Sequence, residues 1–506
     1  MRKRLLAVVL GLGWTVGVGA ADCVHSPWGP EDQIGAANRV TPERTLAAAS
    51  LVREGISHPL GIVITPGMPA YPPRDIQLQV VQPGQHFRTD TTELFGWNAS
   101  ANDDLVQMWL GSGPQLDGLG HMGEAGEFYN CNQGKDFSEI TGLTRLDISQ
   151  VPPLVARGVL IDMAKHFDTD HLKAGQPITR QDIQAAMDAQ GVRAGEGDVI
   201  LFHTGWTVGV GAADCVHSPW GPEDQIGAAN RVTPERTLAA ASLVRKGISH
   251  PLGIVITPGM PAYPPRDIQL QVVQPGQHFR TDTTELFGWN ASANDDLVQM
   301  WLGSGPQLDG LGHMGEGGEF YNCNQGKDFS EITGLTRLDI SQVPPLVARG
   351  VLIDMAKHFD TDHLKAGQPI TRQDIEAAMD AQGVRVEEGD VILFHTGWTD
   401  AKLASEPAEW VSTIPGITND AAHYLASLKP TAVGADTWGL GAVPPIEGDK
   451  VFYDHVVLLK QNGIFILETM NTGRLAAEGV AEFMFVLGQA RLKGAVQMVI
   501  NPVAMW

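Results

Sequence analysis

The chain contains one long segment twice, and this repeat governs how every other feature is assigned. Residues 14–207 recur as residues 206–399, with an offset of 192 positions in a chain of 506 residues. The copies differ at five paired positions: Glu54 and Lys246, Ala125 and Gly317, Gln184 and Glu376, Ala194 and Val386, Gly195 and Glu387. The period is too long and the identity too high for a solenoid, whose units span roughly 20 to 50 residues. The repeat indicates a recent duplication or an assembly error, and a selected two-domain protein is the alternative.

The junction between the copies shows how such a chain can arise. The triplet Gly-Trp-Thr stands at residues 13–15 and again at 205–207, so a crossover between the triplets would generate this sequence. Residues 208–213 then repeat part of the N-terminal leader in mid-chain. We predict a signal peptide (1–21), a truncated first copy (22–207, copy one), a leader remnant (208–213) and one complete domain (214–506). Copy one has no counterpart of residues 400–506, called the tail below; residues 214–399 are copy two.

The N-terminus has the pattern of a secretory signal. Three basic residues at positions 2–4 precede the apolar run 5–19, and small residues follow at Ala20 and Ala21. The run is short for a membrane span, which needs about 20 residues, although an anchor is the alternative. We therefore expect a periplasmic or secreted protein without a membrane partner after cleavage. A net charge of −23 without a basic stripe also argues against a nucleic-acid partner.

The four cysteines represent two positions, each present in both copies. Cys23 and Cys131 recur as Cys215 and Cys323. In an oxidising compartment each pair can close a disulfide, but free thiols are equally compatible with the sequence. No Cys-x-x-Cys occurs, so a zinc site made of thiolates is disfavoured.

Apolar periodicity predicts short strands mixed with helices. The expected strands are 252–257, 268–273, 351–354, 390–395 and 464–467. The expected helices are 234–247, 371–382, 419–428 and 479–487, and a further one ends near residue 462. Strict alternation of strand and helix is absent, so we expect an α/β or α+β fold with a mixed sheet rather than an eight-fold barrel.

A glycine-rich segment in copy two carries the first candidate site. Residues 310–315 match a dinucleotide fingerprint by letters, but no hydrophobic strand precedes them and no helix is expected after them. Asp309 and His313 lie four residues apart in this loop, which suits metal ligation or acid/base chemistry. The structural alternative is that Asp309 caps a turn while His313 bonds to backbone carbonyls.

The tail supplies a second acidic and imidazole pair. His455 is expected two turns before the end of a helix, and Glu468 follows the apolar strand 464–467. Ligand-binding groups of open sheets commonly lie at such strand ends. The alternative for Glu468 is a solvent-facing strand terminus.

In order and spacing these residues resemble the cyclase family of metal-dependent hydrolases, which includes kynurenine formamidases and isatin hydrolases. The family hallmark is His-x-Gly-Thr-His-x-Asp-x-Pro-x-His, followed near the C-terminus by His and then Gly-Ile-x-Ile-x-Glu. The resemblance runs through the whole complete domain, including the segments 389–398, 434–439 and 501–504. It implies an α/β fold of the swivelling β/β/α type.

The chain departs from the hallmark at four positions. Gly303 stands for the first histidine, Pro306 for threonine, Gln307 for the second histidine and Leu311 for proline, as in a branch of the family that has glutamine at the second histidine. The resemblance then implies Asp309, His455 and Glu468 as metal ligands, Gln307 as a weak oxygen ligand and His313 in catalysis. The corresponding residues of copy one are Asp117 and His121. The resemblance implies Mn²⁺ or Zn²⁺ as the bound ion. Loss of two imidazoles weakens zinc binding most, and the oxygen-rich set that remains is suited to Mn²⁺, Mg²⁺ or Ca²⁺.

The resemblance implies an exported metal-dependent hydrolase of a small amide, lactam or lactone. The alternatives are a non-catalytic binding protein with a decayed metal site and a metal-free dehydratase or isomerase. Copy one has no partner for His455 or Glu468, so we expect it to be inactive alone, with an incomplete core and a tendency to aggregate. Trp289, Trp301 and Phe320 indicate either an aromatic pocket or ordinary core. A homo-oligomer is left open.

Overall fold

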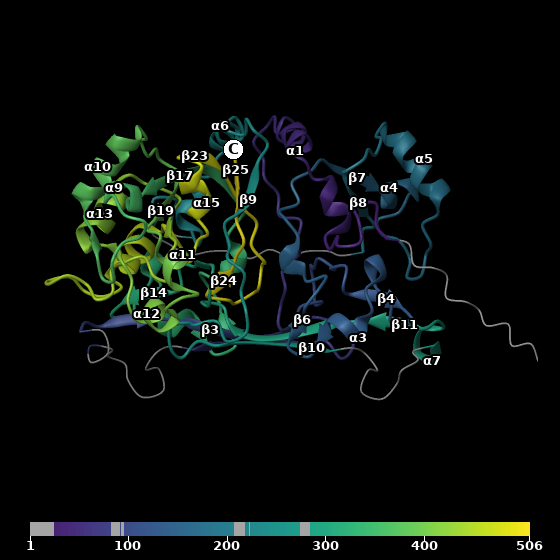
Figure 1. The fold of residues 1–506 in the computed structure, drawn as a ribbon, viewed down its shortest axis with the longest axis horizontal. Helices are drawn as coiled ribbons and strands as arrows, with labels where there is room; N and C mark the ends of the chain where they lie inside the picture. Colours follow the sequence, from purple (N-terminus) through teal and green to yellow (C-terminus); the bar gives the residue numbers. More distant parts are fainter. Residues whose placement is uncertain (1–24, 82–91, 93–95, 207–217, 222, 274–283) are drawn as a thin grey trace, which may run out of the picture.

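The chain forms a mixed α/β structure with two lobes, one for each copy (Figure 1). The computed structural model describes residues 25–81, 92, 96–206, 218–221, 223–273 and 284–506. The predicted signal peptide 1–21, the leader remnant 208–213, Cys23 and Cys215 lie outside the described residues. Within the described part of the chain, no helix is long and apolar enough to cross a membrane.

Copy two and the tail together build one nine-stranded sheet, in the order β24-β13-β22-β21-β19-β17-β23-β25-β9. Copy two supplies β9 (Ser249–Pro251), β13 (Gln307–Asp309), β17 (Leu346–Asp354) and β19 (Val391–His395). The tail supplies β21 (Ala432–Ala435), β22 (Phe465–Glu468), β23 (Glu482–Leu487), β24 (Gln497–Val499) and β25 (Val503–Met505). Strands β17, β19, β21 and β22 run parallel, whereas the outer neighbours pair antiparallel, so the sheet is mixed.

Helices pack onto this sheet. The longest, α10 (Arg372–Gln382), begins with a capping box in which Thr371 and Asp374 bond reciprocally, and it packs on β17. The other helices of this lobe are α6 (Pro234–Ala241), α8 (Gly326–Phe329), α9 (Met355–His358), α11 (Trp398–Lys402), α12 (Pro407–Ser412), α13 (Asn419–Ser427), α14 (Tyr453–His455) and α15 (Gly473–Ala477). Helix α7 (Thr284–Phe287) also comes from copy two but lies beneath the lobe of copy one (Figure 1). Short 3₁₀ turns are η4 (Gly227–Arg231), η5 (Tyr321–Cys323) and η6 (Ile340–Gln342), and η7 (Val456–Gln461) is a π-helix.

Copy one repeats these elements without the large sheet. Its helices and turns are η1 (Gly35–Arg39), α1 (Pro42–Ala49), η2 (Tyr129–Cys131), α3 (Gly134–Phe137), η3 (Ile148–Gln150), α4 (Met163–His166) and α5 (Arg180–Gln190). Strands β7 (Gly158–Asp162) and β8 (Val199–His203) are the counterparts of β17 and β19, and they form a separate two-stranded parallel sheet. The segment equivalent to β13 forms no strand among the described residues, because the tail strands that flank β13 in copy two have no counterpart here.

The two copies contact each other through reciprocal strand pairs. A four-stranded sheet has the order β1-β3-β12-β10, with β3 (Asp103–Trp109) against β12 (Asp295–Trp301) at its centre, between β1 (Ile76–Val81) and β10 (Ile268–Val273). It runs along the lower edge of the molecule in Figure 1. Strand β2 (Ala99–Ala101) pairs with β14 (Met314–Glu316), and β4 (Met122–Glu124) pairs with β11 (Ala291–Ala293). Such reciprocal pairing is that of an isologous dimer, contained here within one chain.

The smaller strands form short pairs. These are β5 (Ser138–Glu139) with β6 (Gly142–Leu143), β15 (Ser330–Glu331) with β16 (Gly334–Leu335), and β18 (Pro369–Ile370) with β20 (Gly416–Ile417).

Most expected elements are present, and two are wrong. The strand expected at 268–273 is β10, those at 351–354, 390–395 and 464–467 overlap β17, β19 and β22, and the helices at 371–382 and 419–428 are α10 and α13. Residues 252–257 form no strand, because the edge strand of the sheet is β9 just before them. Residues 482–487 form a strand instead of a helix, because they pair with β17 on one side and β25 on the other. The helix expected over 234–247 stops at Ala241.

The cysteines behave differently in the two copies. Cys131 of copy one is disulfide-bonded, whereas Cys323 of copy two is an exposed free thiol.

Candidate metal and catalytic site

Strands β13 and β22 bring the two predicted carboxylates together. They pair antiparallel, so Gln307 of copy two lies opposite Glu468 of the tail, and Asp309 lies opposite Ile466. Gln307 is 1% exposed, Asp309 0% and Glu468 4%. The expected glycine-rich loop is therefore a buried strand at this point, the second from one edge of the sheet, and Glu468 is not a solvent-facing terminus.

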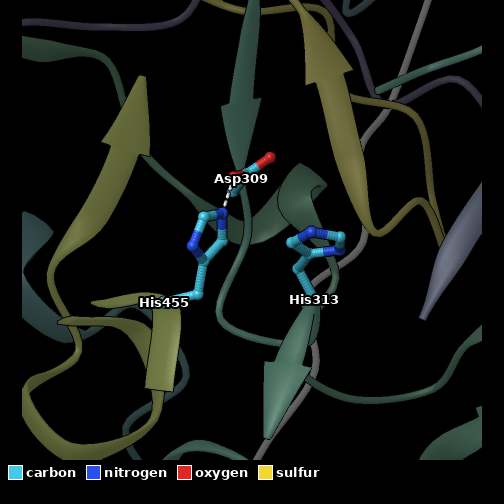
Figure 2. Close-up of side chains that lie close together, drawn as sticks. All are labelled: Asp309, His313 and His455. Atoms are coloured by element: carbon cyan, nitrogen blue, oxygen red, sulfur yellow. Dashed lines mark ion pairs between the residues drawn. The ribbon is translucent and has the colours of Figure 1, made fainter. Parts of the chain in front are cut away.

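His455 reaches the carboxylates from the helix that precedes β22. Its Nε2 lies 3.6 Å from Asp309 Oδ2 (Figure 2) and 3.2 Å from Glu468 Oε1. Its Nδ1 lies 3.0 Å from Asp454 Oδ2. A carboxylate behind the imidazole fixes the ring so that Nε2 faces the other acidic groups, as is common behind metal-binding histidines. Sequence analysis did not single out Asp454, although its position directly before His455 is a usable signal.

Gln307 lies between the two carboxylates. Its Nε2 donates to Asp309 Oδ1 at 3.0 Å and to Glu468 Oε2 at 2.8 Å. An amide nitrogen has no lone pair to offer a cation, so in this arrangement Gln307 holds the two acids in place rather than acting as the predicted oxygen ligand.

His313 lies at the end of the loop that follows β13, facing His455 at a ring-centroid distance of 6.0 Å. Its Nδ1 lies 2.6 Å from the backbone carbonyl oxygen of Asn102, which belongs to copy one. A carbonyl only accepts, so Nδ1 carries the proton and Nε2 keeps its lone pair. The side-chain amide of Gln497 in the tail lies 2.7 Å from the same Nδ1, so with Nδ1 protonated it is the otherwise unpartnered amide oxygen that has to face this N–H.

Burial dominates the electrostatics of the cluster. It raises the pKa of Asp309 well above the ordinary value, as does the charge of Glu468, and burial likewise raises the pKa of Glu468. Burial and the nearby charge of His455 lower the pKa of His313 well below the ordinary histidine value. Burial alone would lower the pKa of His455, but Asp454 and Glu468 outweigh it and raise this pKa well above normal. His313 is therefore neutral near pH 7. The acids around His455 favour its protonated form, and a cation that binds at Nε2 would displace that proton.

The donor set fits a divalent cation. Asp309, His313 and His455 each offer one ligand atom, and these atoms lie within 4.8 Å of one another. Asp309 Oδ2 is buried and has no hydrogen-bond partner among the described residues, a costly state for a carboxylate unless a cation occupies the site. The predicted ligand Glu468 directs one oxygen at the same imidazole nitrogen as Asp309.

Arg266 occupies the space where the hallmark has its first histidine. Its Nη1 donates to the Gly303 carbonyl at 2.7 Å, and a Cβ atom added at Gly303 would lie 2.6 Å from Arg266 Cζ. A distance of 2.6 Å is far below carbon contact, so a side chain at position 303 and this arginine exclude each other. Sequence analysis missed Arg266, which comes near Asp309 only through the tertiary fold.

A pocket of about 100 Å³ opens next to the cluster. Its aromatic lining is Tyr263, Trp438 and Phe452, and Tyr263 stacks on Trp438 at 5.1 Å. The aromatic residues singled out from the sequence lie elsewhere: Phe320 is core at 1% exposed, and Trp289 is 42% exposed. Trp301 is half-buried and belongs to β12.

Copy one does not assemble this cluster. Asp117 is exposed and bonds to Gln115, its neighbour two positions earlier. His121 keeps the interface bond of its counterpart, with Nδ1 2.6 Å from the carbonyl oxygen of Asn294. Where the tail lies in copy two, copy one has an open cavity of about 560 Å³ lined by Asp117 and His121.

Comparisons with known proteins agree with this architecture. A family model described as "Putative cyclase" matches residues 56–250 and again 246–442. A solved structure described as a novel cyclase is 28% identical, with a TM-score of 0.51, covering 57% of this chain and 96% of that chain. One whole family member therefore corresponds to little more than half of this chain, as expected of a duplication.

Two isatin hydrolases are also similar at lower identity. Isatin hydrolase A from Labrenzia aggregata, bound to benzyl benzoate, is 18% identical with a TM-score of 0.36, covering 51% of this chain and 93% of that chain. Isatin hydrolase A from Ralstonia solanacearum is 16% identical with a TM-score of 0.37, covering 51% of this chain and 91% of that chain. No curated protein matches the chain.

Proposed function

This chain belongs to the Cyclase family, and on that basis we propose that it is an exported, metal-dependent hydrolase with one active site. The substrate class is a small amide, lactam or lactone. The basic and then apolar residues at positions 2–21 support export.

The observation that carries the proposal is the buried oxygen Asp309 Oδ2. It has no hydrogen-bond partner among the described residues, and it lies 3.6 Å from His455 Nε2. Asp309, His455 and Glu468 would hold the ion, which is Mn²⁺ or Zn²⁺. Two carboxylates and one imidazole favour the harder Mn²⁺ over a thiolate-seeking ion.

A bound divalent ion supplies a Lewis acid that polarises a carbonyl oxygen and lowers the pKa of water. The residues of the chain supply the rest of the chemistry. Asp454 orients His455 through Nδ1, and Gln307 fixes one oxygen each of Asp309 and Glu468. These contacts leave Asp309 Oδ2 and His455 Nε2 directed at one point.

His313 is suited to move the proton. Its Nδ1–H is held by the Asn102 carbonyl, so Nε2 is the atom that accepts and returns a proton. Its pKa lies well below the ordinary value because of burial, which keeps the base free at neutral pH. His313 is 7% exposed and lines the pocket beside His455, within reach of a small substrate.

The pocket favours a small ring-containing substrate. Tyr263, Trp438 and Phe452 provide flat apolar walls, and Arg266 provides one cationic group at the same pocket. Hydrolysis of an amide or lactone yields a carboxylate, which an arginine in the wall can accept.

The alternative from another class is a small-molecule-binding protein without catalysis. The observation that favours it is Arg266, whose charge opposes the rise that burial causes in the pKa of Asp309 and Glu468 and so partly replaces a cation. A metal-free dehydratase or isomerase using Asp309 and His313 is the third candidate. Metal dependence of hydrolysis separates the proposal from both.

The test is hydrolysis of a panel of aryl amides, lactams and lactones by the full chain. Chelator treatment should abolish turnover, and Mn²⁺ or Zn²⁺ should restore it. Asp309→Asn should lower kcat/KM more than the roughly 10–100-fold that loss of a residue behind the metal ligands costs.

Asp117→Asn is the matched control, because it makes the same change at the exposed counterpart in copy one. It should leave kcat/KM within about twofold of the parent, since substitutions at surface positions are usually close to neutral. Turnover that resists chelator, or an equal loss in both variants, would contradict the proposal.

A further inference from the structure

Copy one enters the site of copy two through Asn102, which links β2 to β3, and through Asp103, the first residue of β3. Asn102 and Asp103 line the same pocket as Arg266, His313 and Glu468. Both are buried, Asn102 at 0% and Asp103 at 8% exposed. The site therefore contains groups from the copy that has no complete site of its own.

Asn102 holds His313 from across the interface. Its backbone carbonyl accepts from His313 Nδ1 at 2.6 Å, and its side-chain Nδ2 donates to the Gly312 carbonyl at 2.6 Å. Ser330 Oγ donates to Asn102 Oδ1, also at 2.6 Å. The hydrogen bonds to Gly312 and Ser330 therefore anchor Asn102, whose carbonyl fixes the tautomer of His313.

Asp103 holds Arg266 in the same way. Arg266 Nε donates to Asp103 Oδ2 at 2.8 Å, in an ion pair whose side chains are 12% and 11% exposed. Arg266 Nη1 is held by Gly303. A guanidinium released from Asp103 would be free to turn toward Asp309 and Glu468, where it would compete with a cation.

The equivalent contacts, related by the pseudo-two-fold symmetry of the two copies, occur at copy one, where no site forms. Arg74 Nε donates to Asp295 Oδ2 at 2.8 Å, and Arg74 Nη1 donates to the Gly111 carbonyl at 2.8 Å. There Asp117 is exposed and the tail is absent. The Arg74–Asp295 pair is therefore a control, because removing it measures what such an ion pair contributes to the interface without any effect on the site.

We propose that copy one is a built-in partner of the single site, in which Asp103 and Asn102 are positioning residues for Arg266 and His313. The inference rests on the proposed function for its chemistry. It assigns a role to a truncated copy that cannot act by itself, and it accounts for one site in a chain with two copies of the motif.

The test compares Asp103→Asn with Asp295→Asn in the full chain. Mn²⁺ affinity is measured by titration and, independently, kcat and KM are measured with the best substrate. Asp103→Asn should weaken Mn²⁺ binding by roughly 10–100-fold, the effect typical of residues behind a metal ligand set, and should lower kcat. Asp295→Asn should change neither.

A double-mutant cycle tests whether Asp103→Asn acts by releasing Arg266 or by destabilising the fold. Asp103→Asn combined with Arg266→Lys should cost no more than either change alone, because the two residues act as a pair. The cycle of Asp295→Asn with Arg74→Lys should leave Mn²⁺ affinity unchanged. The thermal unfolding midpoints of Asp103→Asn and Asp295→Asn should agree, because the two variants remove equivalent ion pairs at the interface.

The outcomes distinguish this inference from the proposed function. The parent chain could bind Mn²⁺ while Asp103→Asn and Asp295→Asn change its affinity by equal amounts. That result overturns the inference and leaves the proposed hydrolase function standing. A selective effect of Asp103→Asn on Mn²⁺ affinity without hydrolysis of any substrate supports the inference and overturns the hydrolase. Absence of Mn²⁺ binding in the parent chain overturns both.

Discussion

His250 and His58 are the same residue in the two copies, yet their surroundings differ. His250 is 7% exposed in β9, with Nε2 3.3 Å from the Asn471 carbonyl of the tail, whereas His58 is exposed. Burial lowers the pKa of His250 below the ordinary value. At this scale the tail, and not the local sequence, decides whether this histidine is buried.

The pH dependence of stability should follow His250. The folded chain binds a proton at His250 less readily than the unfolded chain, so its contribution is present above the unfolded value of about 6.5 and is lost as pH falls below it. His250→Gln should flatten the fall in urea midpoint between pH 7.5 and 5.5, and His58→Gln should not. An unchanged slope in His250→Gln would show that this histidine is not the titrating group.

The candidate site shows what a sequence can and cannot reveal about single residues. Asp309, His313, His455 and Glu468 come together as predicted from two motifs that are over a hundred positions apart. Arg266, Asp454, Asn102 and Asp103 were missed. Arg266 reaches the site from the segment just before β10, and Asn102 and Asp103 reach it across the interface between copies, which no local spacing encodes.

Identical strands have opposite environments in this chain. Val391–His395 (β19) is buried along its whole length, whereas the same five residues in copy one, Val199–His203 (β8), have the burial pattern of a surface strand. Phe394 is 0% exposed and Phe202 45%. The β-strand was predictable from composition, but its burial depends on tail strands and helices that copy one lacks.

The wrong helix at 479–487 has the same origin. Its apolar residues suit either a buried helix or a buried strand, because a short apolar run carries no clear period. Pairing with β17 and β25 decides in favour of the strand. The alternating segment 268–273, by contrast, was predictable because its period of two is a strand signal by itself.

Phenylalanine truncation should separate the two strands. Phe394→Ala should destabilise the chain by about 3–5 kcal/mol, because it opens a cavity in a filled core. Phe202→Ala should change stability by less than about 0.5 kcal/mol, as a substitution at an exposed position. Urea unfolding of both variants measures the difference, and equal losses would mean that copy one buries this strand in solution.

The whole molecule is a pseudo-symmetric pair in which one half is complete. The four-stranded sheet and the reciprocal strand pairs join the halves (Figure 1), and so do two equivalent arginine–aspartate pairs. Copy one leaves apolar side chains on its surface, among them Leu160, Ile200 and Trp206. Their exposure agrees with the expected incomplete core, and aggregation through this surface remains a prediction.

The central claim is that two copies of the motif make one metal site. Metal content of the full chain, purified without chelator and equilibrated with Mn²⁺, tests it most directly. We predict about one ion per chain, lost in Asp309→Ala and retained in Asp117→Ala, because Asp309 alone has His455 and Glu468 as partners. Two ions per chain, no ion, or loss of the ion in Asp117→Ala would contradict the account.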